Sequence, residues 1–189
     1  VIYNLAKKAG LPVSESDIPV LDGKPNRTIW EYLSGQHPDD FQLGSRSFYD
    51  TFPDARSFEE ACQDEFDNHI DSITPIPSVR MIFNDFQGQG RPVAIVSNSM
   101  TRSVCKGLTV AGYNISDNQI IIGVDQVQNP KPSPAGYLKA LSMINSGRTG
   151  DPLKPKDILI IEDSITGVKS ALATGAHVLH LTDKSGLMD

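Results

Sequence analysis

Two adjacent carboxylates, Glu162 and Asp163, follow a run of four apolar residues at 158–161. Such a run is long enough for a strand that is buried on both faces, as in a parallel sheet. Neighbouring carboxylates repel each other and lose hydration unless a cation lies between them, and Mg²⁺ prefers oxygen ligands of this kind. The pair could instead form a solvated acidic turn at the start of a helix, where negative charge is favoured. Both interpretations remain open from this stretch alone.

Polar residues also follow two other apolar runs. Ser97 and Asn98 come directly after the run at 93–96, and Lys131 lies in a proline-rich loop after a strand expected at Ile120–Ile122. Open parallel sheets bind ligands where the carboxyl ends of their strands meet. A hydroxyl group, a helix N-terminus, a cation and a carboxylate pair holding Mg²⁺ can together bind a phosphoryl group. Ser97 could instead cap a helix and Lys131 could be a solvated charge, but the three features in this order predict one shared site.

The elements that must position these residues differ between the two parts of the chain. After residue 77, strand-like runs alternate with helical segments, which predicts right-handed crossovers and an α/β core with a Rossmann-like, doubly wound parallel sheet. Residues 1–75 have the apolar spacing of helices, apart from a segment at 37–54 that is expected to be irregular. We therefore expect a small helical domain over 1–76 and the core over 77–189. The expected helices cover 1–9, 28–33, a segment opened by a capping box at 57–60, 79–86, 101–111, 135–144 and 166–174.

Composition and charge exclude several classes of protein. The formal net charge is −6 and there is no basic run, which argues against nucleic acid or an anionic membrane as a partner. No apolar stretch approaches the roughly 18 residues of a membrane-spanning helix, and no signal-peptide pattern is present. Cys62 and Cys105 lack the spacing of metal ligands. We therefore expect reduced thiols in a cytoplasmic, monomeric protein whose partner is a small molecule and neither nucleic acid nor a membrane.

Three segments together resemble a known family. Residues 96–99 (Val-Ser-Asn-Ser), 129–134 (Asn-Pro-Lys-Pro-Ser-Pro) and 161–176 (beginning Ile-Glu-Asp-Ser-Ile-Thr-Gly) are similar to motifs II, III and IV of the haloacid dehalogenase-like superfamily. The resemblance covers about residues 1–182 and is strongest to phosphatases and phosphoglucomutases that carry a helical cap after their first motif. It implies that residues 1–76 form this cap domain.

The resemblance also implies roles for individual residues. Ser97, with Asn98 beside it, would bind the phosphoryl group of the substrate. Lys131 would neutralise charge on the nucleophile and the phosphate. Glu162 and Asp163 would anchor the cofactor Mg²⁺.

One departure from the family concerns its first motif, Asp-x-Asp-Gly-Thr, which supplies the nucleophile and a general acid/base. The nearest match, at residues 20–24, has one aspartate and resembles a specificity loop of the cap instead. Lys24 and Arg27 of this loop would bind the substrate, the alternative being ordinary surface charges. We interpret the chain as a fragment of an enzyme, inactive as written; a pseudoenzyme is the alternative. Loss of the strand bearing this motif would leave a gap in the sheet.

The function implied for the intact protein is that of a Mg²⁺-dependent phosphatase. It would act on a small phosphorylated metabolite, by analogy a sugar phosphate, through an aspartyl-phosphate intermediate. A phosphotransferase similar to β-phosphoglucomutase is one alternative. A non-catalytic protein that binds phosphorylated metabolites is another, if the first motif is truly absent. A dehalogenase needs no Mg²⁺, so the carboxylate pair argues against that activity.

Overall fold

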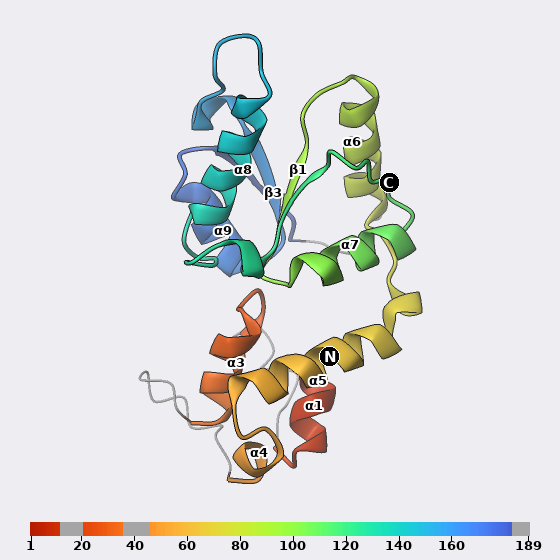
Figure 1. Cartoon of the computed structure of the whole chain (residues 1–189), viewed down its shortest axis with the longest axis vertical. Coiled ribbons are helices and arrows are strands. Elements are labelled where there is room, and N and C mark those ends of the chain that lie inside the picture. Colours follow the sequence, from red (N-terminus) through yellow and green to blue (C-terminus); the bar gives the residue numbers. More distant parts are fainter. Residues whose placement is uncertain (12–20, 36–45, 183–189) are drawn as a thin grey trace. The chain divides into compact units, whose positions relative to one another are not determined.

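The structure is a computed structural model, and it describes residues 1–11, 21–35 and 46–182 (Figure 1). The chain divides into two compact units, Val1–Asp71 and Ser72–Asp189. We call them unit 1 and unit 2 and describe each by itself. In the part of the chain that the structure describes, no helix combines the length and the apolar character that crossing a membrane requires.

Unit 1 is helical throughout its described parts. A 3-10 turn, η2 (Ile70–Ser72), follows its last helix. The helices are α1 (Ile2–Lys8), α3 (Asn26–Leu33), α4 (Arg46–Thr51) and α5 (Ala55–Asn68).

The core of unit 1 is built around aromatic rings. Phe48, Phe52 and Phe58 have ring centroids 5.1 to 5.5 Å apart in tilted and edge-to-face arrangements, which the charge distribution of aromatic rings favours. The buried indole of Trp30 donates a hydrogen bond of 2.8 Å to the carbonyl of Phe52. Smaller apolar residues complete this cluster: Leu5, Ala6, Ala9, Leu11, Leu21, Ile29, Leu33 and Cys62.

Two local expectations for unit 1 were wrong. The segment expected to be irregular contains α4, because Phe48 and Phe52 lie one helical turn apart and both enter the core; residues 37–45 of that segment lie outside the described part. Helix α5 begins three residues earlier than expected. Asp54 is its N-cap and accepts a hydrogen bond of 2.7 Å from the Ser57 amide, so Ser57 is the third helical residue of the capping box.

Unit 2 alternates helices with short strands. The 3-10 turns are η3 (Val124–Gln126) and η4 (Pro155–Asp157). The helices are α6 (Pro77–Gly88), α7 (Thr101–Val110), α8 (Ala135–Ser146) and α9 (Ile165–Leu172). The strands are β1 (Ala94–Val96), β2 (Ile120–Ile122), β3 (Leu159–Glu162) and β4 (His177–His180).

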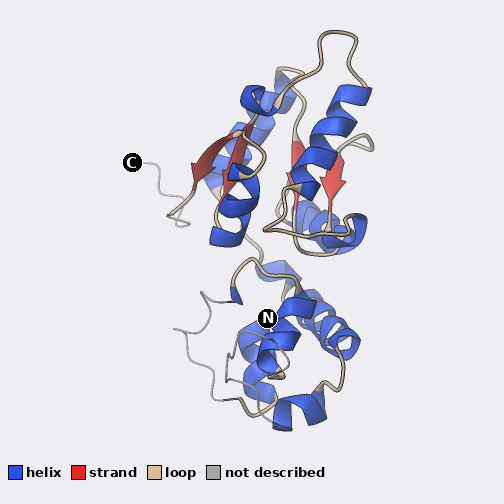
Figure 2. Ribbon diagram, turned by 90° about the vertical axis from the view of Figure 1, so that its left-hand side faces the viewer, coloured by secondary structure: helices blue, strands red, loops and turns tan. Residues whose placement is uncertain are grey.

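The described strands pair in parallel as two separate two-stranded sheets (Figure 2). Ala94 of β1 is opposite Ile120 of β2, and Leu159 of β3 is opposite His177 of β4. The α/β class and the parallel pairing agree with expectation, and the doubly wound sheet is interrupted, in line with the gap expected for a chain without the strand of the first motif. The reason is that β1 and β3 do not pair with each other, and no strand among the described residues joins them.

Helix α8 packs closely against the first sheet. Gly136 in its first turn is buried, and a Cβ atom added there would lie 2.7 Å from Cγ1 of Val96 and 3.9 Å from Cγ2 of Ile122. Glycine therefore allows the helix backbone to approach β1 and β2. This contact holds the start of α8, and the residues on it, at a defined height above the strands.

Candidate functional site

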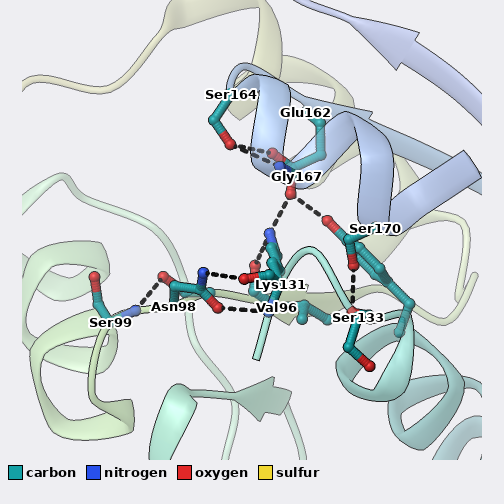
Figure 3. Close-up of polar contacts among 11 residues, drawn as sticks. Val96, Asn98, Ser99, Lys131, Ser133, Glu162, Ser164, Gly167 and Ser170 are labelled. Carbon is teal, nitrogen blue, oxygen red and sulfur yellow. Dashed lines mark hydrogen bonds and ion pairs between the residues drawn. The ribbon is translucent and has the colours of Figure 1, made fainter. Parts of the chain in front are cut away.

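Lys131 lies at the centre of a polar cluster at the carboxyl ends of β1 and β3 (Figure 3). Its side chain is only 9% exposed. The Nζ atom donates a hydrogen bond of 3.0 Å to the carbonyl of Val96, the last residue of β1, and forms an ion pair with Oε1 of Glu162, the last residue of β3. A buried ammonium group is stable only when it is paired in this way, so the lysine ties the two strand ends together.

The Glu162 carboxylate is held from several directions. Oε1 accepts hydrogen bonds from Lys131 and from the hydroxyl of Tyr137 on α8. Oε2 lies 3.5 Å from Oγ of Ser164. A Cβ atom added at Gly167 in the first turn of α9 would overlap the carboxylate, so glycine makes the space that this buried group occupies.

Asn98 joins the loop after β1 to the loop that carries Lys131. Its Nδ2 donates to the Lys131 carbonyl at 3.1 Å, and the Lys131 amide donates to its Oδ1 at 2.9 Å. The amide side chain thus pairs with the lysine backbone as a neighbouring strand would. Ser97 is one residue away: its amide donates to the Ile122 carbonyl at 2.9 Å, and its Oγ accepts from the Ser99 amide at 3.0 Å.

Helix α7, which follows this loop, is capped by a residue distant in the sequence. Oδ1 of Asp125 accepts hydrogen bonds from the amide and the hydroxyl of Thr101, at 2.7 and 2.9 Å. Burial works to raise the pKa of Asp125, but the hydrogen bonds from Thr101, with the Asp125 backbone amide and the charge of Lys139, together hold the pKa below its usual value. The N-cap residue Met100 contributes no side-chain bond. Capping by Ser97 or Ser99, the ordinary explanation for these hydroxyls, is therefore not what this helix uses.

The N-terminus of α9 is capped by Ser164, whose Oγ accepts a hydrogen bond of 3.0 Å from the Gly167 amide. Ser170 of the same helix is fully buried and donates a hydrogen bond of 2.7 Å to the carbonyl of Ser133. Because Ser133 lies two residues after Lys131, this bond fixes the far side of the lysine loop. The cap bond of this helix is therefore made by a serine and not by Glu162 or Asp163.

Tyr137 contributes both its hydroxyl and its ring. Burial, followed by the negative charge of Glu162 and the hydrogen bond to it, raises the pKa of Tyr137 well above its usual value. The phenol therefore remains a protonated donor throughout the physiological pH range. The centre of its ring lies 4.9 Å from Nζ of Lys131, within the range of a cation–π contact.

Sequence reasoning identified some of these residues and missed others. Lys131 contacts both Asn98 and Glu162, as expected for one shared site. Ser97 precedes Asn98 in the chain, and the exposed Asp163 follows Glu162. Four residues that hold the cluster were not anticipated: Tyr137, Gly167, Ser170 and Asp125. The only available signal for Tyr137 was a hydroxyl-bearing ring in the first turn of the helix after Lys131.

The two remaining residues predicted for the site belong to unit 1. Nζ of Lys24 lies 5.1 Å from the ring centre of Tyr32. Nε of Arg27 lies 3.4 Å from Oε1 of Glu31, one helical turn along α3, and the arginine side chain is 76% exposed. An exposed pair of this kind contributes little to stability.

The carboxylates fit a partial site for Mg²⁺. Within the described residues there is no group of three or more His, Cys, Asp or Glu side chains that could hold a metal ion. Glu162 and Asp163 supply hard oxygen donors, and Mg²⁺ usually takes one or two carboxylates while keeping water or substrate phosphate as its other ligands. Because both oxygens of the buried Glu162 carboxylate already have neighbours in the cluster, the exposed carboxylate of Asp163 is the more accessible donor of the pair.

Two surface hollows of unit 2 lie elsewhere. They measure about 370 and about 490 Å³ and share Gly90, Pro92, Asn118 and Ile120 in their linings. Pro92 precedes β1 and Ile120 begins β2, so both hollows are at the amino ends of these strands. None of the residues of the Lys131 cluster lines them. The chemistry of the strand ends, rather than the size of a hollow, therefore locates the candidate site.

Curated relatives match parts of this chain. It is 29% identical over 114 residues to a bifunctional riboflavin kinase/FMN phosphatase from Arabidopsis thaliana, covering 60% of this chain and 28% of that protein. It is 34% identical over 79 residues to pyrophosphatase PpaX from Listeria monocytogenes, covering 42% and 36%. It is 26% identical over 109 residues to hexitol phosphatase A from Escherichia coli, covering 58% and 46%. The matches thus span less than half the length of these three relatives.

Solved structures and a family profile match nearly the whole chain. A hydrolase from Pseudomonas syringae aligns with a TM-score of 0.75 at 17% identity, covering 100% of this chain and 76% of that one. A protein from Thermotoga maritima that is named as a putative β-phosphoglucomutase aligns with a TM-score of 0.56 at 22% identity, covering 98% of this chain and 79% of that one. At these identities the structures establish the fold alone. The profile of the haloacid dehalogenase-like hydrolases matches residues 2–181, and the chain therefore belongs to this family.

Proposed function

We propose that the protein is a Mg²⁺-dependent phosphatase that acts on a small phosphorylated metabolite. The observation that carries the proposal is the buried Lys131–Glu162 ion pair at the ends of β1 and β3. A cation held beside a hydroxyl and an acidic pair suits a phosphoryl group, whose charge such groups offset. The relatives named as phosphatases support this reaction class, and hexitol phosphatase A supports a sugar phosphate as the substrate.

Each residue has a distinct part in the proposed site. Lys131 has three N–H donors, of which the Val96 carbonyl and Glu162 take two, so the third can bind a phosphoryl oxygen. Ser97 accepts a bond from the Ser99 amide through its oxygen, and its hydroxyl proton can be donated to the substrate. Asn98 holds the Lys131 backbone and so directs the ammonium group. Glu162 and Asp163 would hold Mg²⁺, which would offset charge on the phosphoryl oxygens.

In the reaction we propose, an aspartate carboxylate attacks phosphorus in line with the ester oxygen. The phosphorus–ester bond breaks, and the second aspartate of the first motif would protonate the leaving alcohol. Water then attacks phosphorus and gives a proton back to that aspartate, the aspartyl-phosphate bond breaks, and inorganic phosphate leaves with the first aspartate regenerated. This sequence contains no Asp-x-Asp-Gly-Thr motif to supply these aspartates. We therefore propose this chemistry for the intact protein and expect the 189-residue chain to bind phosphate without turnover.

The same proposal extends to the architecture. In this proposal the two strand pairs, β1 with β2 and β3 with β4, would be halves of one doubly wound sheet in the intact protein, with the strand of the first motif between β1 and β3. Lys131 already bridges the ends of these two strands. Unit 1 is the cap, and Lys24 and Arg27 contact the substrate from it. On this proposal Arg27→Ala lowers kcat/KM by a factor equivalent to about 1–3 kcal/mol, the range of a charge-assisted hydrogen bond.

The absence of the Asp-x-Asp-Gly-Thr motif from this sequence favours a second candidate function, the binding of phosphorylated metabolites without catalysis. Without a nucleophile, the Lys131 cluster would bind a phosphorylated metabolite and release it unchanged. A phosphotransferase similar to β-phosphoglucomutase is the other alternative within the family, since such a protein is among the structural neighbours.

Two measurements separate these functions. The protein as its gene encodes it is assayed with sugar phosphates, FMN and pyrophosphate, with Mg²⁺ and after its removal. Mg²⁺-dependent release of phosphate from a sugar phosphate supports the phosphatase, and isomerised sugar phosphate without release supports the mutase. The 189-residue chain is titrated with inorganic phosphate by calorimetry. If the full-length protein and the 189-residue chain both bind phosphate and neither turns over a substrate, the binding function is supported in place of the enzymatic one. If neither phosphate binding nor turnover is observed, the proposed site is overturned.

A further inference from the structure

We propose that Tyr137 is a positioning residue for Lys131, with two separable parts: its hydroxyl orients the Glu162 carboxylate, and its ring confines the lysine ammonium group. The inference rests on the proposed phosphate site, because the lysine is positioned for an anion. Tyr137 itself does not contact the substrate in this proposal.

The backbone of Tyr137 has little freedom. It lies in the first turn of α8, next to Gly136, whose Cα approaches β1 and β2 so closely that no side chain fits between them. The loop just before α8 is held by the bond between Ser170 and the Ser133 carbonyl. A side chain on such a fixed turn can impose its orientation on a neighbour, because moving it would require the helix to move.

The hydroxyl of Tyr137 shares an acceptor with Lys131. Both donate to Oε1 of Glu162, and the Glu162 side chain is 7% exposed. Its other oxygen, Oε2, lies against Ser164 and the backbone of Gly167. A carboxylate with a single partner could rotate about its terminal bond, since this torsion is soft. Because two donors bind Oε1 and Ser164 and Gly167 pack against Oε2, the Glu162 carboxylate is held in one orientation. The direction of the ion pair is therefore set partly by the phenol.

The ring of Tyr137 limits the lysine from a different side. Its centre is 4.9 Å from Nζ, while the Val96 carbonyl lies 3.0 Å from the same atom. Together with Glu162 these groups surround the ammonium group and restrict its rotamers. A cation already confined in its binding geometry loses less conformational freedom when an anion arrives, so its affinity for phosphate is higher.

Two substitutions separate the hydroxyl from the ring. Tyr137→Phe removes the bond to Glu162 and keeps the ring, whereas Tyr137→Leu removes both. Tyr113→Phe is the matched control, because Tyr113 is a partly buried tyrosine of the same unit whose ring packs on Phe83 at 5.1 Å, away from the cluster. The 189-residue chain is titrated with inorganic phosphate by calorimetry in buffer without divalent cations. We expect about threefold to tenfold weaker binding for Tyr137→Phe and a larger loss for Tyr137→Leu, whereas Tyr113→Phe binds as the wild type does.

A spectroscopic measurement tests the position of the lysine without any ligand. In protein labelled with ¹³C,¹⁵N-lysine, the Lys131 ε-methylene protons are shifted upfield by the nearby ring, and Lys131→Arg identifies the signal by its loss. The upfield shift persists in Tyr137→Phe and disappears in Tyr137→Leu. This outcome supports confinement by the ring even if the wild-type chain fails to bind phosphate, a failure that would count against the proposed function instead.

The proposal is overturned by either of two results. One is a Lys131 signal that is the same in the wild type and Tyr137→Leu. The other is a lowered melting temperature for both Tyr137 variants with unchanged phosphate affinity, which would show that the tyrosine only supports the fold. If the ring positions Lys131, Tyr137→Phe must bind phosphate more tightly than Tyr137→Leu and less tightly than the wild type.

Discussion

The described interiors of the two units differ in their content of polar side chains. In the described part, the continuous cluster of buried apolar residues lies entirely in unit 1, between Leu5 and Cys62. Among the described residues, the buried polar and charged side chains all belong to unit 2: Ser103, Lys131, Glu162, Ser164 and Ser170. Unit 2 also buries apolar residues such as Phe83, Ile122 and Ile160. Apolar burial stabilises without fixing directions, whereas buried hydrogen bonds and ion pairs hold groups in specified orientations. The unit with buried polar groups among its apolar residues is therefore the one suited to positioning reactive groups.

The largest effect is expected from the core of unit 1. Phe58 is fully buried between Phe48 and Phe52, so Phe58→Ala leaves a cavity and should lower the free energy of unfolding by about 3–5 kcal/mol. Trp30, the one tryptophan of the chain, lies in the same core, so its fluorescence during urea unfolding reports on unit 1. Phosphate affinity under native conditions should be unchanged. A loss of affinity in the folded variant would show that the two units do not divide stability and binding as proposed.

A smaller loss is expected when the ion pair of unit 2 is broken. Lys131→Met leaves the Glu162 carboxylate buried without its cation and should cost about 3 kcal/mol, since both side chains are less than one-tenth exposed. Adding Glu162→Gln should recover part of this loss, because an amide is cheaper to bury than an unpaired charge. Unfolding of each variant is followed by far-ultraviolet circular dichroism and compared with Trp30 fluorescence. A double variant less stable than Lys131→Met would show that the pair is not the source of the effect.

How far the sequence could predict these regions depends on the distance between interacting residues. The strand at Ile120–Ile122 and the start of α8 after Pro134 were predicted correctly, because β-branched runs and a proline at a helix start are local signals. The meeting of Lys131 with Glu162 followed from the rule that parallel strands end at one edge. Tyr137 could not be found, because its contact depends on how α8 is rotated against the strands. The same holds for the cap of Thr101 by Asp125, 24 residues away.

The doubly wound sheet is divided into two strand pairs in the described structure, in line with the gap expected for a chain without the first motif, and the reason is physical. An apolar run indicates a strand through its own side chains, but a strand inside a continuous sheet also needs hydrogen bonds to the backbone of a neighbouring strand on each side. β1 and β3 each have one partner, β2 and β4 respectively. Periodicity at 93–96 and 158–161 carried no information about what lies between them.

A moderate loss of stability is expected when the space between the Gly167 backbone and the Glu162 carboxylate is filled. Gly167→Ala places a methyl group in the space that the Glu162 carboxylate occupies, and the carboxylate cannot retreat because Lys131 and Tyr137 hold it. Overpacking of this kind should cost about 1–3 kcal/mol and weaken phosphate binding. Gly88→Ala is the control, since an added Cβ there meets nothing within 4 Å. If Gly167→Ala binds phosphate as tightly as the wild type, the orientation of Glu162 does not matter for the site.

The smallest expected effect concerns two aspartates that cap helices, one in each unit. Asp54 caps its own helix α5 in unit 1, where a hydrogen bond from the Ser57 amide holds its pKa below the usual value. Asp125 caps α7 in unit 2 from another part of the fold, and the bonds from Thr101, with the Asp125 backbone amide and the charge of Lys139, together outweigh burial to lower its pKa as well. Because both pKa values fall on folding, the stabilisation is present above the usual pKa of 3.8 and is lost as the pH falls through the lower value of the folded state.

The two caps should differ in what their loss disturbs. Asp125→Ala should lower stability by about 1 kcal/mol or less at pH 7, because solvent screens this exposed carboxylate, and the difference from the wild type should shrink as the pH is lowered below 3.8. It should also weaken phosphate binding, since Asp125 fixes the start of α7, which directly follows the loop of Ser97 and Asn98. Asp54→Ala should have the same pH dependence without changing phosphate affinity. Urea unfolding at several pH values and calorimetry at pH 7 measure both quantities, and equal phosphate affinities for the two variants would mean that polar links in unit 2 stabilise the fold without positioning the site.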